Sequence, residues 1–251
     1  MARIIAIHSF RGGTGKSNVT ANLAALLAAD GRRVGVVDTD IQSPGIHTLF
    51  GSDGERMERS LNDYLWGKRA ITQTARDVTA NLGGEVAGKV FLVPSSLKAG
   101  DIARALREGY DVGRLNDGFR RLADELRLDA LLLDTHPGLN EETLLSIAVS
   151  DALVVMLRPD RQDYQGTGVT VEVARKLEAK RLMLVINNAP PTLDLAEVRA
   201  WAERTYAAEV AAALPHSGEM MALGSAGVFA LRYPDHALTS ALKELAAKLM
   251  S

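Results

Sequence analysis

The chain begins Met1-Ala2-Arg3 and continues as Ile4-Ile5-Ala6-Ile7-His8-Ser9-Phe10-Arg11-Gly12-Gly13-Thr14-Gly15-Lys16-Ser17. Its apolar residues predict a strand over 4–8, its glycines predict a turn, and residues 18–29 have the pattern of a helix. In such a strand–turn–helix unit, converging backbone N–H groups and the positive end of the helix bind phosphate groups. The stretch therefore predicts a phosphate-binding loop and a nucleotide site.

The side chains of this loop carry specific roles. Lys16 would reach the β and γ phosphates of a nucleotide, and the Ser17 hydroxyl would bind Mg²⁺. The usual pattern starts with glycine, whereas Phe10 stands at that position here. A glycine-rich turn with a chance Lys-Ser pair is the alternative, and the strand and helix flanks favour the phosphate loop. The predicted nucleotide-binding residues of the loop are Gly12, Gly13, Thr14, Gly15, Lys16, Ser17 and Asn18.

Short apolar runs alternate with helical patterns along the rest of the chain. The predicted strands are 4–8, Arg33–Asp38, 90–94, Ala130–Asp134, Ala152–Leu157, 182–187 and 209–214. The predicted helices between them include 102–108, 114–127, 168–179 and Leu195–Tyr206. This alternation predicts an α/β fold with a doubly wound, mainly parallel sheet flanked by helices, in one domain over 1–251. Residues 51–89 lack a strand pattern, and we expect helices and loops there.

Carboxylates stand where the second and fourth predicted strands end. Asp134 follows a leucine run at the end of the fourth predicted strand, Asp38 ends the second, and Asp40 stands two residues beyond it. Ligands of such sheets bind beyond the carboxyl ends of the strands, so we expect Ser17, Asp38 and Asp134 to hold Mg²⁺. Asp40 lies two residues beyond Asp38 and past the predicted end of the strand, so it would act from the loop, near the attacking water. The alternatives are a helix-capping Asp134 and a solvated Asp40.

Composition excludes several classes of function. The 251 residues contain no cysteine, which removes disulfides, thiolate metal sites and cysteine nucleophiles. A formal net charge of −2 argues against a strongly basic nucleic-acid-binding protein. The first strand leaves no room for a signal peptide, and no apolar run approaches the roughly 20 residues of a membrane span. We expect a cytoplasmic protein.

Three motifs together resemble the ParA/MinD family of ATPases, which have a deviant Walker A loop. The family's K-G-G-x-G-K-[ST] loop is similar to Arg11–Ser17, its D-x-D-plus-glutamine motif to Asp38-Thr39-Asp40-Ile41-Gln42, and its D-x-x-P-G motif to Asp134-Thr135-His136-Pro137-Gly138. The resemblance extends over essentially the whole chain. Two departures are Arg11 in place of the family's first lysine, and His136, where the family often has a small residue or proline.

The resemblance implies ATP and Mg²⁺ as cofactors and a homodimer in the ATP state. Arg11 would reach across the dimer interface to the partner's ATP, and its planar fork differs from a lysine ammonium. Asp40 would activate or position the catalytic water. Asn187 would read the adenine edge, and Pro215 would pack near the base. The catalytic residues implied in this way are Lys16, Asp40 and Arg11.

Two kinds of working surface, DNA and a membrane, are open to such a protein. DNA is favoured by the family, and the densest basic cluster is Arg175, Lys176, Lys180 and Arg181. A membrane-binding terminal helix is the alternative, because Leu238, Leu242, Leu245 and Leu249 share one helical stripe. The stripe lacks aromatic anchors, which favours a terminal helix packed on the core.

These observations predict a Mg²⁺-dependent ATPase that acts as a dimerisation switch. It would position or partition DNA or a protein assembly, and a partner protein would stimulate hydrolysis. The alternatives are an ATP-dependent synthetase of the dethiobiotin or cobyrinate type, a MinD-like membrane-associated regulator, and a nucleotide sensor without hydrolysis.

Overall fold

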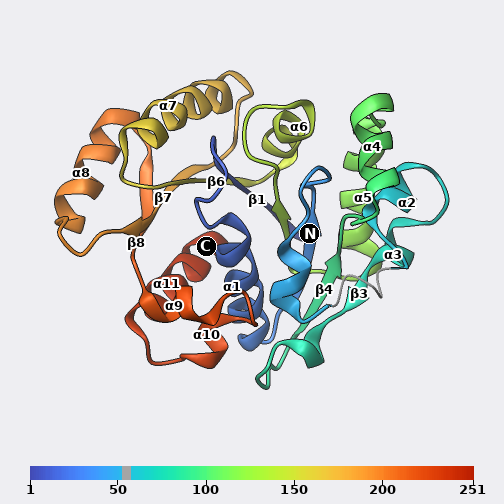
Figure 1. Ribbon diagram of the computed structural model, residues 1–251, viewed down its shortest axis with the longest axis horizontal. Coiled ribbons are helices and arrows are strands. Elements are labelled where there is room, and N and C mark those ends of the chain that lie inside the picture. Colours follow the sequence, from blue (N-terminus) through green and yellow to red (C-terminus); the bar gives the residue numbers. More distant parts are fainter. Residues whose placement is uncertain (53–57) are drawn as a thin grey trace.

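The computed structural model describes residues 1–52 and 58–251, which form an eight-stranded sheet with helices on both faces (Figure 1). The strand order is β3-β4-β2-β5-β1-β6-β7-β8. β3 pairs with β4 in antiparallel fashion, and the other neighbouring pairs are parallel. The predicted doubly wound α/β fold is confirmed.

The elements have the following bounds. The strands are β1 (Arg3–His8), β2 (Arg33–Asp38), β3 (Arg76–Asp77), β4 (Lys89–Val93), β5 (Ala130–Asp134), β6 (Ala152–Leu157), β7 (Leu182–Ala189) and β8 (Glu209–Pro215). The α-helices are α1 (Lys16–Ala29), α2 (Leu61–Leu65), α3 (Ile71–Thr74), α4 (Ala99–Glu108), α5 (Val112–Glu125), α6 (Glu141–Val149), α7 (Arg161–Lys176), α8 (Leu195–Tyr206), α9 (Gly218–Leu223), α10 (Phe229–Arg232) and α11 (Ala237–Met250). Two 3₁₀ helices are η1 (Ile46–Phe50) and η3 (Thr79–Asn81).

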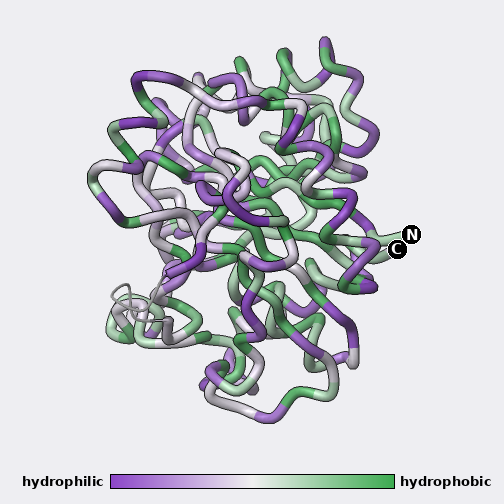
Figure 2. The backbone as a smooth tube through the Cα atoms, turned by 90° about the vertical axis from the view of Figure 1, so that its right-hand side faces the viewer, coloured by the Kyte–Doolittle hydropathy of each residue, from purple (hydrophilic) through white to green (hydrophobic). Residues whose placement is uncertain are grey.

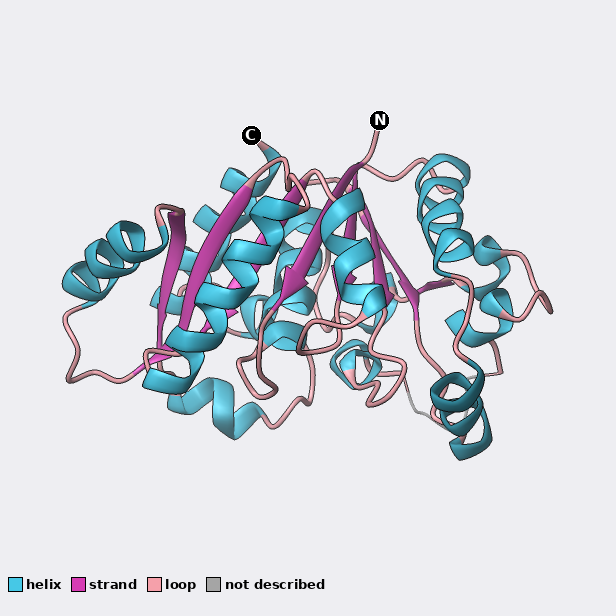
Figure 3. Ribbon diagram, turned by 90° about the horizontal axis from the view of Figure 1, so that it is seen from above, coloured by secondary structure: helices cyan, strands magenta, loops and turns pink. Residues whose placement is uncertain are grey.

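Two apolar cores lie on opposite faces of the sheet, which Figure 3 shows between the two helix layers. Alternate strand residues enter different cores: Ile5 and Ile7 belong to the core under α1, and Ala6 belongs to the other. This period of two explains why the central strands are apolar along their whole length. Hydrophobic segments accordingly fill the interior in Figure 2.

Helix α11 packs on the first core beside α1. Leu238, Leu242, Leu245 and Leu249 are all buried there. The terminal helix is therefore a part of the core, as the sequence favoured. Its leucine side chains are buried and do not form a membrane-binding surface. Among the described residues, none of the helices has the length and apolar character needed to cross a bilayer.

The structure differs from the sequence-based prediction in several places. The region 51–89, of which residues 53–57 lie outside the described part, contains the edge strand β3, two residues long and too short for a sequence pattern. Helix α7 begins seven residues before the predicted start at 168, because Asp160 caps it by accepting from the backbone N–H groups of Gln162 and Asp163. Helix α6 was not predicted, and the Asn140 side chain caps its start.

The position of β1 determines where the site forms. β1 lies in the sheet between β5 and β6, and the chain order reverses direction there. Parallel sheets bind ligands at such a point, beyond the carboxyl ends of the strands. The two termini lie close together (Figure 2), at the end of the sheet where β1 begins. There an Arg3 guanidinium N–H donates to the Leu249 carbonyl over 2.7 Å.

Candidate nucleotide-binding site

The glycine-rich loop connects β1 to α1 in a conformation that requires its glycines. Gly13 and Gly15 have φ angles of 76° and 91°, in the left-handed region that favours glycine. A Cβ at Gly15 would collide with the amide nitrogen of Asn187. That nitrogen donates to the Thr14 carbonyl over 2.7 Å, so the end of β7 holds the loop in place.

A cavity of about 300 Å³ lies beside the loop. The predicted residues Asn18, Asn187 and Pro215 line it. The contact of Asn187 with adenine stays a prediction, and the structure adds that its amide nitrogen is already used by Thr14. Sequence reasoning missed Met220 and Met221 on short helix α9, which also line the cavity. An apolar wall beside amide groups is the usual lining of a site for a flat base.

Lys16 is buried at the bottom of the loop. Its ammonium donates to the Ser9 hydroxyl over 3.0 Å, and the residue is 7% exposed. Burial lowers the pKa of Lys16, while the negative charges of Asp134 and Asp40 act in the opposite direction. The N–H groups of the loop would bind the oxygens of a phosphate group, and the Lys16 ammonium would face these oxygens.

Asp38 and Asp134 stand side by side where β2 and β5 end, because they are direct partners in the parallel pairing of these strands. Both are buried. Burial, with the charges of Asp134 and Asp40, raises the pKa of Asp38 well above its usual range. Burial likewise raises the pKa of Asp134 to about 6, although hydrogen bonds from Ser17 and Thr20 act against this.

This pair fits a divalent cation. In the described part of the chain, Asp38 Oδ2 is buried without a hydrogen-bond partner, which leaves a carboxylate oxygen for a ligand. The same part contains no cluster of three acidic, histidine or cysteine side chains that would hold a metal alone. Mg²⁺ usually binds with one or two carboxylates, several waters and substrate phosphates, so two carboxylates and the Ser17 hydroxyl suit it.

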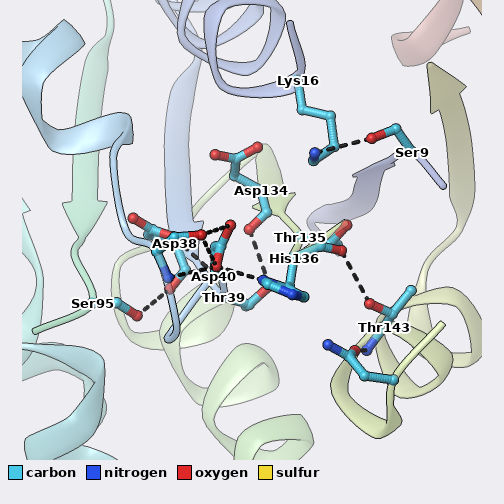
Figure 4. Close-up of polar contacts among 12 residues, drawn as sticks. Ser9, Lys16, Asp38, Thr39, Asp40, Ser95, Asp134, Thr135, His136 and Thr143 are labelled. Carbon is cyan, nitrogen blue, oxygen red and sulfur yellow. Dashed lines mark hydrogen bonds and ion pairs between the residues drawn. The ribbon is translucent and has the colours of Figure 1, made fainter. Parts of the chain in front are cut away.

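Asp40 lies just beyond β2 and contacts His136 (Figure 4). Its backbone N–H donates to Asp38 Oδ1 over 3.0 Å, and its Oδ1 atom lies 2.7 Å from His136 Nδ1. Asp40 thus lies in the loop and is not a freely solvated carboxylate, and its role toward the attacking water stays a prediction. The contact with His136 was not predicted, because no local pattern joins residues 96 positions apart.

Backbone hydrogen bonds connect three loops of the site: the phosphate loop after β1, the Asp40 loop after β2 and the His136 loop after β5. The Gly138 N–H donates to the Ser9 carbonyl over 3.1 Å, and the Thr39 N–H donates to the Asp134 carbonyl over 3.0 Å. These bonds fix the position of the three loops relative to one another. The Pro137-Gly138 segment lies directly against the phosphate loop.

Arg11 contacts its own chain at the start of α7. One guanidinium nitrogen lies 3.5 Å from Asp163 Oδ1 and 3.9 Å from Asp160 Oδ1. The Arg11 side chain is 40% exposed, and Asp163 is also held by Arg158 at 3.1 Å. Asp163 itself is buried, but it keeps its contacts with the Arg158 side chain and backbone N–H, so Arg11 can leave without an unpaired carboxylate remaining.

Phe10, which replaces the usual glycine, packs on helix α7 at Gly166. A Cβ at Gly166 would collide with the Phe10 ring and would lie 2.8 Å from Phe10 Cβ. The missing side chain at Gly166 therefore accommodates the large residue in the loop. Sequence reasoning treated Phe10 as a departure without a partner, because the two positions are far apart in the chain.

We expect Gly166→Ala to destabilise the protein by about 1–3 kcal/mol, since the new methyl group overpacks the Phe10 contact. Gly168→Ala is the matched control on the same helix, because its nearest atom, Tyr206 Cε1, is 3.8 Å away. The control should stabilise α7 by up to about 1 kcal/mol. Urea unfolding measures both changes. Adding Phe10→Ala should restore the Gly166→Ala protein, and equal stabilities of the two glycine variants would contradict the argument.

The phosphate loop, the buried lysine and the two strand-end carboxylates on a doubly wound sheet define a P-loop NTPase. A protein-family model, ParA, described as "NUBPL iron-transfer P-loop NTPase", matches residues 1–250. The chain belongs to this ParA family, whose members bind and hydrolyse ATP.

Individual proteins agree with this assignment. The uncharacterized ATP-binding protein MJ0547 of Methanocaldococcus jannaschii is 28% identical over 251 residues, which cover 100% of this chain and 88% of that protein. Septum site-determining protein MinD from Pyrococcus horikoshii, solved with Mg-ADP, has a similar fold, with a TM-score of 0.80, 21% identity, and coverage of 99% and 96% of the two chains. Cobyrinic acid a,c-diamide synthase from Mycobacterium smegmatis, solved with ADP and magnesium, gives a TM-score of 0.74 at 18% identity, with coverage of 100% and 94%.

Proposed function

We propose that the chain is a Mg²⁺-dependent ATPase of the cytoplasm that closes into a homodimer with ATP and reopens after hydrolysis. The observation that supports this most is the cluster of Lys16, Asp38, Asp134 and Asp40 around one glycine-rich loop. The cluster has a cation for phosphates, two carboxylates for a metal and one for a water. A protein that only binds a nucleotide would not need the third carboxylate, Asp40.

The proposed reaction is the attack of water on the γ-phosphorus of ATP. The water oxygen forms a bond to phosphorus, the bond to the β–γ bridging oxygen breaks, and ADP and inorganic phosphate leave with the proton of the water on phosphate. Lys16 and the loop N–H groups hold the phosphates, and Asp40 orients the water. Ser17, Asp38 and Asp134 would hold Mg²⁺, which neutralises charge on the phosphates when bound.

The dimer part of the proposal rests on Arg11. Its side chain is 40% exposed, and its guanidinium nitrogen lies 3.5 Å from Asp163, a long contact to a carboxylate that Arg158 also holds at 3.1 Å. When Arg11 leaves, Asp163 keeps Arg158, so no buried carboxylate is left unpaired. Arg11 would then reach the phosphates of ATP bound to the second copy.

Two rival functions receive less support. A synthetase of the cobyrinate type shares the fold. It would need a second substrate site, whereas we assign the cavity beside the loop to the base of the nucleotide. An iron-transfer role is suggested by the family description. These 251 residues contain no cysteine, so they offer no thiolate for an iron–sulfur cluster.

We propose that a protein partner, rather than DNA or a membrane, is the working surface. In the predicted basic cluster, Arg175 and Arg181 donate to the Tyr206 and Lys248 carbonyls of their own chain. Lys176 and Lys180 are 73% and 66% exposed in ion pairs with Glu172 and Asp151, which leaves two exchangeable cations that stand beside carboxylates as the phosphate-binding part of this cluster. The terminal leucines are buried. ATP-dependent, salt-sensitive binding to duplex DNA would restore DNA as the surface.

The proposal is tested by the mass of the protein in solution. We expect a monomer with ADP and a dimer with a slowly hydrolysed ATP analogue, measured by light scattering. Arg11→Ala should stay monomeric with the analogue while it binds nucleotide normally. Arg158→Ala, which removes the other cation at Asp163, should still dimerise. A wild-type protein that stays monomeric, or hydrolyses ATP only with an added small-molecule substrate, would overturn the switch in favour of the synthetase.

A further inference from the structure

We propose that His136 is the residue that positions Asp40 for the attack of water. This inference rests on the proposed ATPase function and deepens it. It also gives a role to a histidine that departs from the motif in which it stands. Three features of the described structure carry it: the hydrogen bonds of the two Asp40 oxygens, the anchoring of the histidine backbone, and the burial of both side chains.

The two oxygens of the Asp40 carboxylate have unequal surroundings. Oδ1 accepts from His136 Nδ1 at 2.7 Å, from the Ser43 N–H at 3.0 Å and from the Ser43 hydroxyl at 3.1 Å. The Ser43 hydroxyl is also 3.1 Å from Oδ2. Oδ1 therefore has its full set of donors, whereas Oδ2 keeps acceptor capacity. We infer that Oδ2 is the oxygen that receives the hydrogen bond of the attacking water.

His136 is the donor that fixes the plane of this carboxylate. Ser43 lies three residues from Asp40 on the same loop and moves with it, so its bonds alone do not fix Asp40 relative to the phosphate loop. His136 belongs to a different connection, between β5 and α6, which is bonded to the phosphate loop through Gly138 and Ser9. The contact with His136 is thus the side-chain link that relates Asp40 to the nucleotide.

The histidine itself is held firmly. Its carbonyl accepts from the Thr143 hydroxyl at 3.3 Å, and Pro137 follows it in the chain. The side chains of His136 and Asp40 are only 20% and 16% exposed, so water competes weakly for their hydrogen bond. Charge-assisted hydrogen bonds of this length are stronger than neutral ones, which suits a positioning contact.

The contact uses Nδ1, and this allows a sharp test. The amide nitrogen of asparagine can occupy the place of Nδ1, whereas the longer side chain of glutamine places its amide nitrogen near the place of Nε2. We expect His136→Asn to keep kcat for ATP hydrolysis within about threefold of wild type. His136→Ala and His136→Gln should lower kcat by about tenfold to 100-fold, since misplacement by about 1 Å can cost 100-fold.

The KM for ATP and the affinity for ADP should stay unchanged in all three variants, because Lys16 and the phosphate loop are intact. This split between kcat and KM separates positioning from loss of the nucleotide site. Thermal unfolding of each variant monitors the fold, and Lys243→Ala, on the exposed side of α11, is the control for unrelated substitutions.

Two results would overturn the inference. One is a His136→Ala protein with wild-type kcat. The other is a His136→Asn protein that loses as much activity as His136→Ala, since that would mean a need for the whole imidazole. An inactive wild-type protein would instead refute the proposed ATPase, and His136 would lose its role with it. If His136→Ala fails to fold, the comparison of His136→Asn with His136→Gln decides.

Discussion

Replacing Lys16 by alanine is expected to abolish nucleotide binding. Lys16 is buried, and its ammonium is the cation that the loop places beside Asp134 and Asp40. Its removal leaves the negative charges of the site without their nearest positive charge and removes the donor for the β and γ phosphates. We expect the Kd for ATP to rise by at least about 100-fold, which corresponds to about 2.8 kcal/mol.

Titration calorimetry with ADP and with ATP measures this effect. Lys176→Ala is the matched control, because Lys176 is an exposed lysine that pairs with Glu172 at 2.9 Å on the surface of α7. It should bind nucleotide like the wild type. Lys16→Met keeps the apolar stem of the side chain and replaces the alanine variant if that variant is unstable. Wild-type affinity in a folded Lys16 variant would show that the phosphates bind elsewhere.

The parts of the site that could be predicted are those with local patterns. The phosphate loop is one short segment with fixed spacing, and the carboxylates directly end apolar strands. Asp38 and Asp134 meet because parallel strands bring their carboxyl ends to one edge, so their pairing follows from the sheet. Asp40 lies two residues beyond the predicted end of the strand, which places it in the loop, and the structure has it there.

The contacts that could not be predicted join distant segments. Arg11 meets Asp163 across 152 positions, and Asp40 meets His136 across 96. Phe10 fits because Gly166, on another element, has no side chain. Such contacts depend on how loops pack after the sheet has formed. In the sequence they leave only isolated departures from a motif, such as Phe10, Arg11 and His136.

Replacing Asp40 by alanine is expected to separate ATP binding from hydrolysis. Phosphate contacts come from the loop and Lys16, which the substitution does not alter, so the Kd for ATP should stay within about threefold of wild type. Hydrolysis loses the group that orients the water, and positioned acid–base groups contribute about 10²–10⁴-fold to rates. The variant should therefore remain a dimer with ATP itself, because ATP persists. Single-turnover hydrolysis and light scattering measure the two effects.

Asp124→Ala, an exposed aspartate on α5, is the control and should hydrolyse ATP normally. The double variant with Asp40→Ala and His136→Ala gives the strongest argument. If His136 acts through Asp40, the histidine has nothing left to position, and the double variant should be no slower than Asp40→Ala alone. Independent roles would instead multiply the two losses. A normal rate for Asp40→Ala would remove Asp40 from the reaction and leave its bond to His136 as a structural contact between two loops.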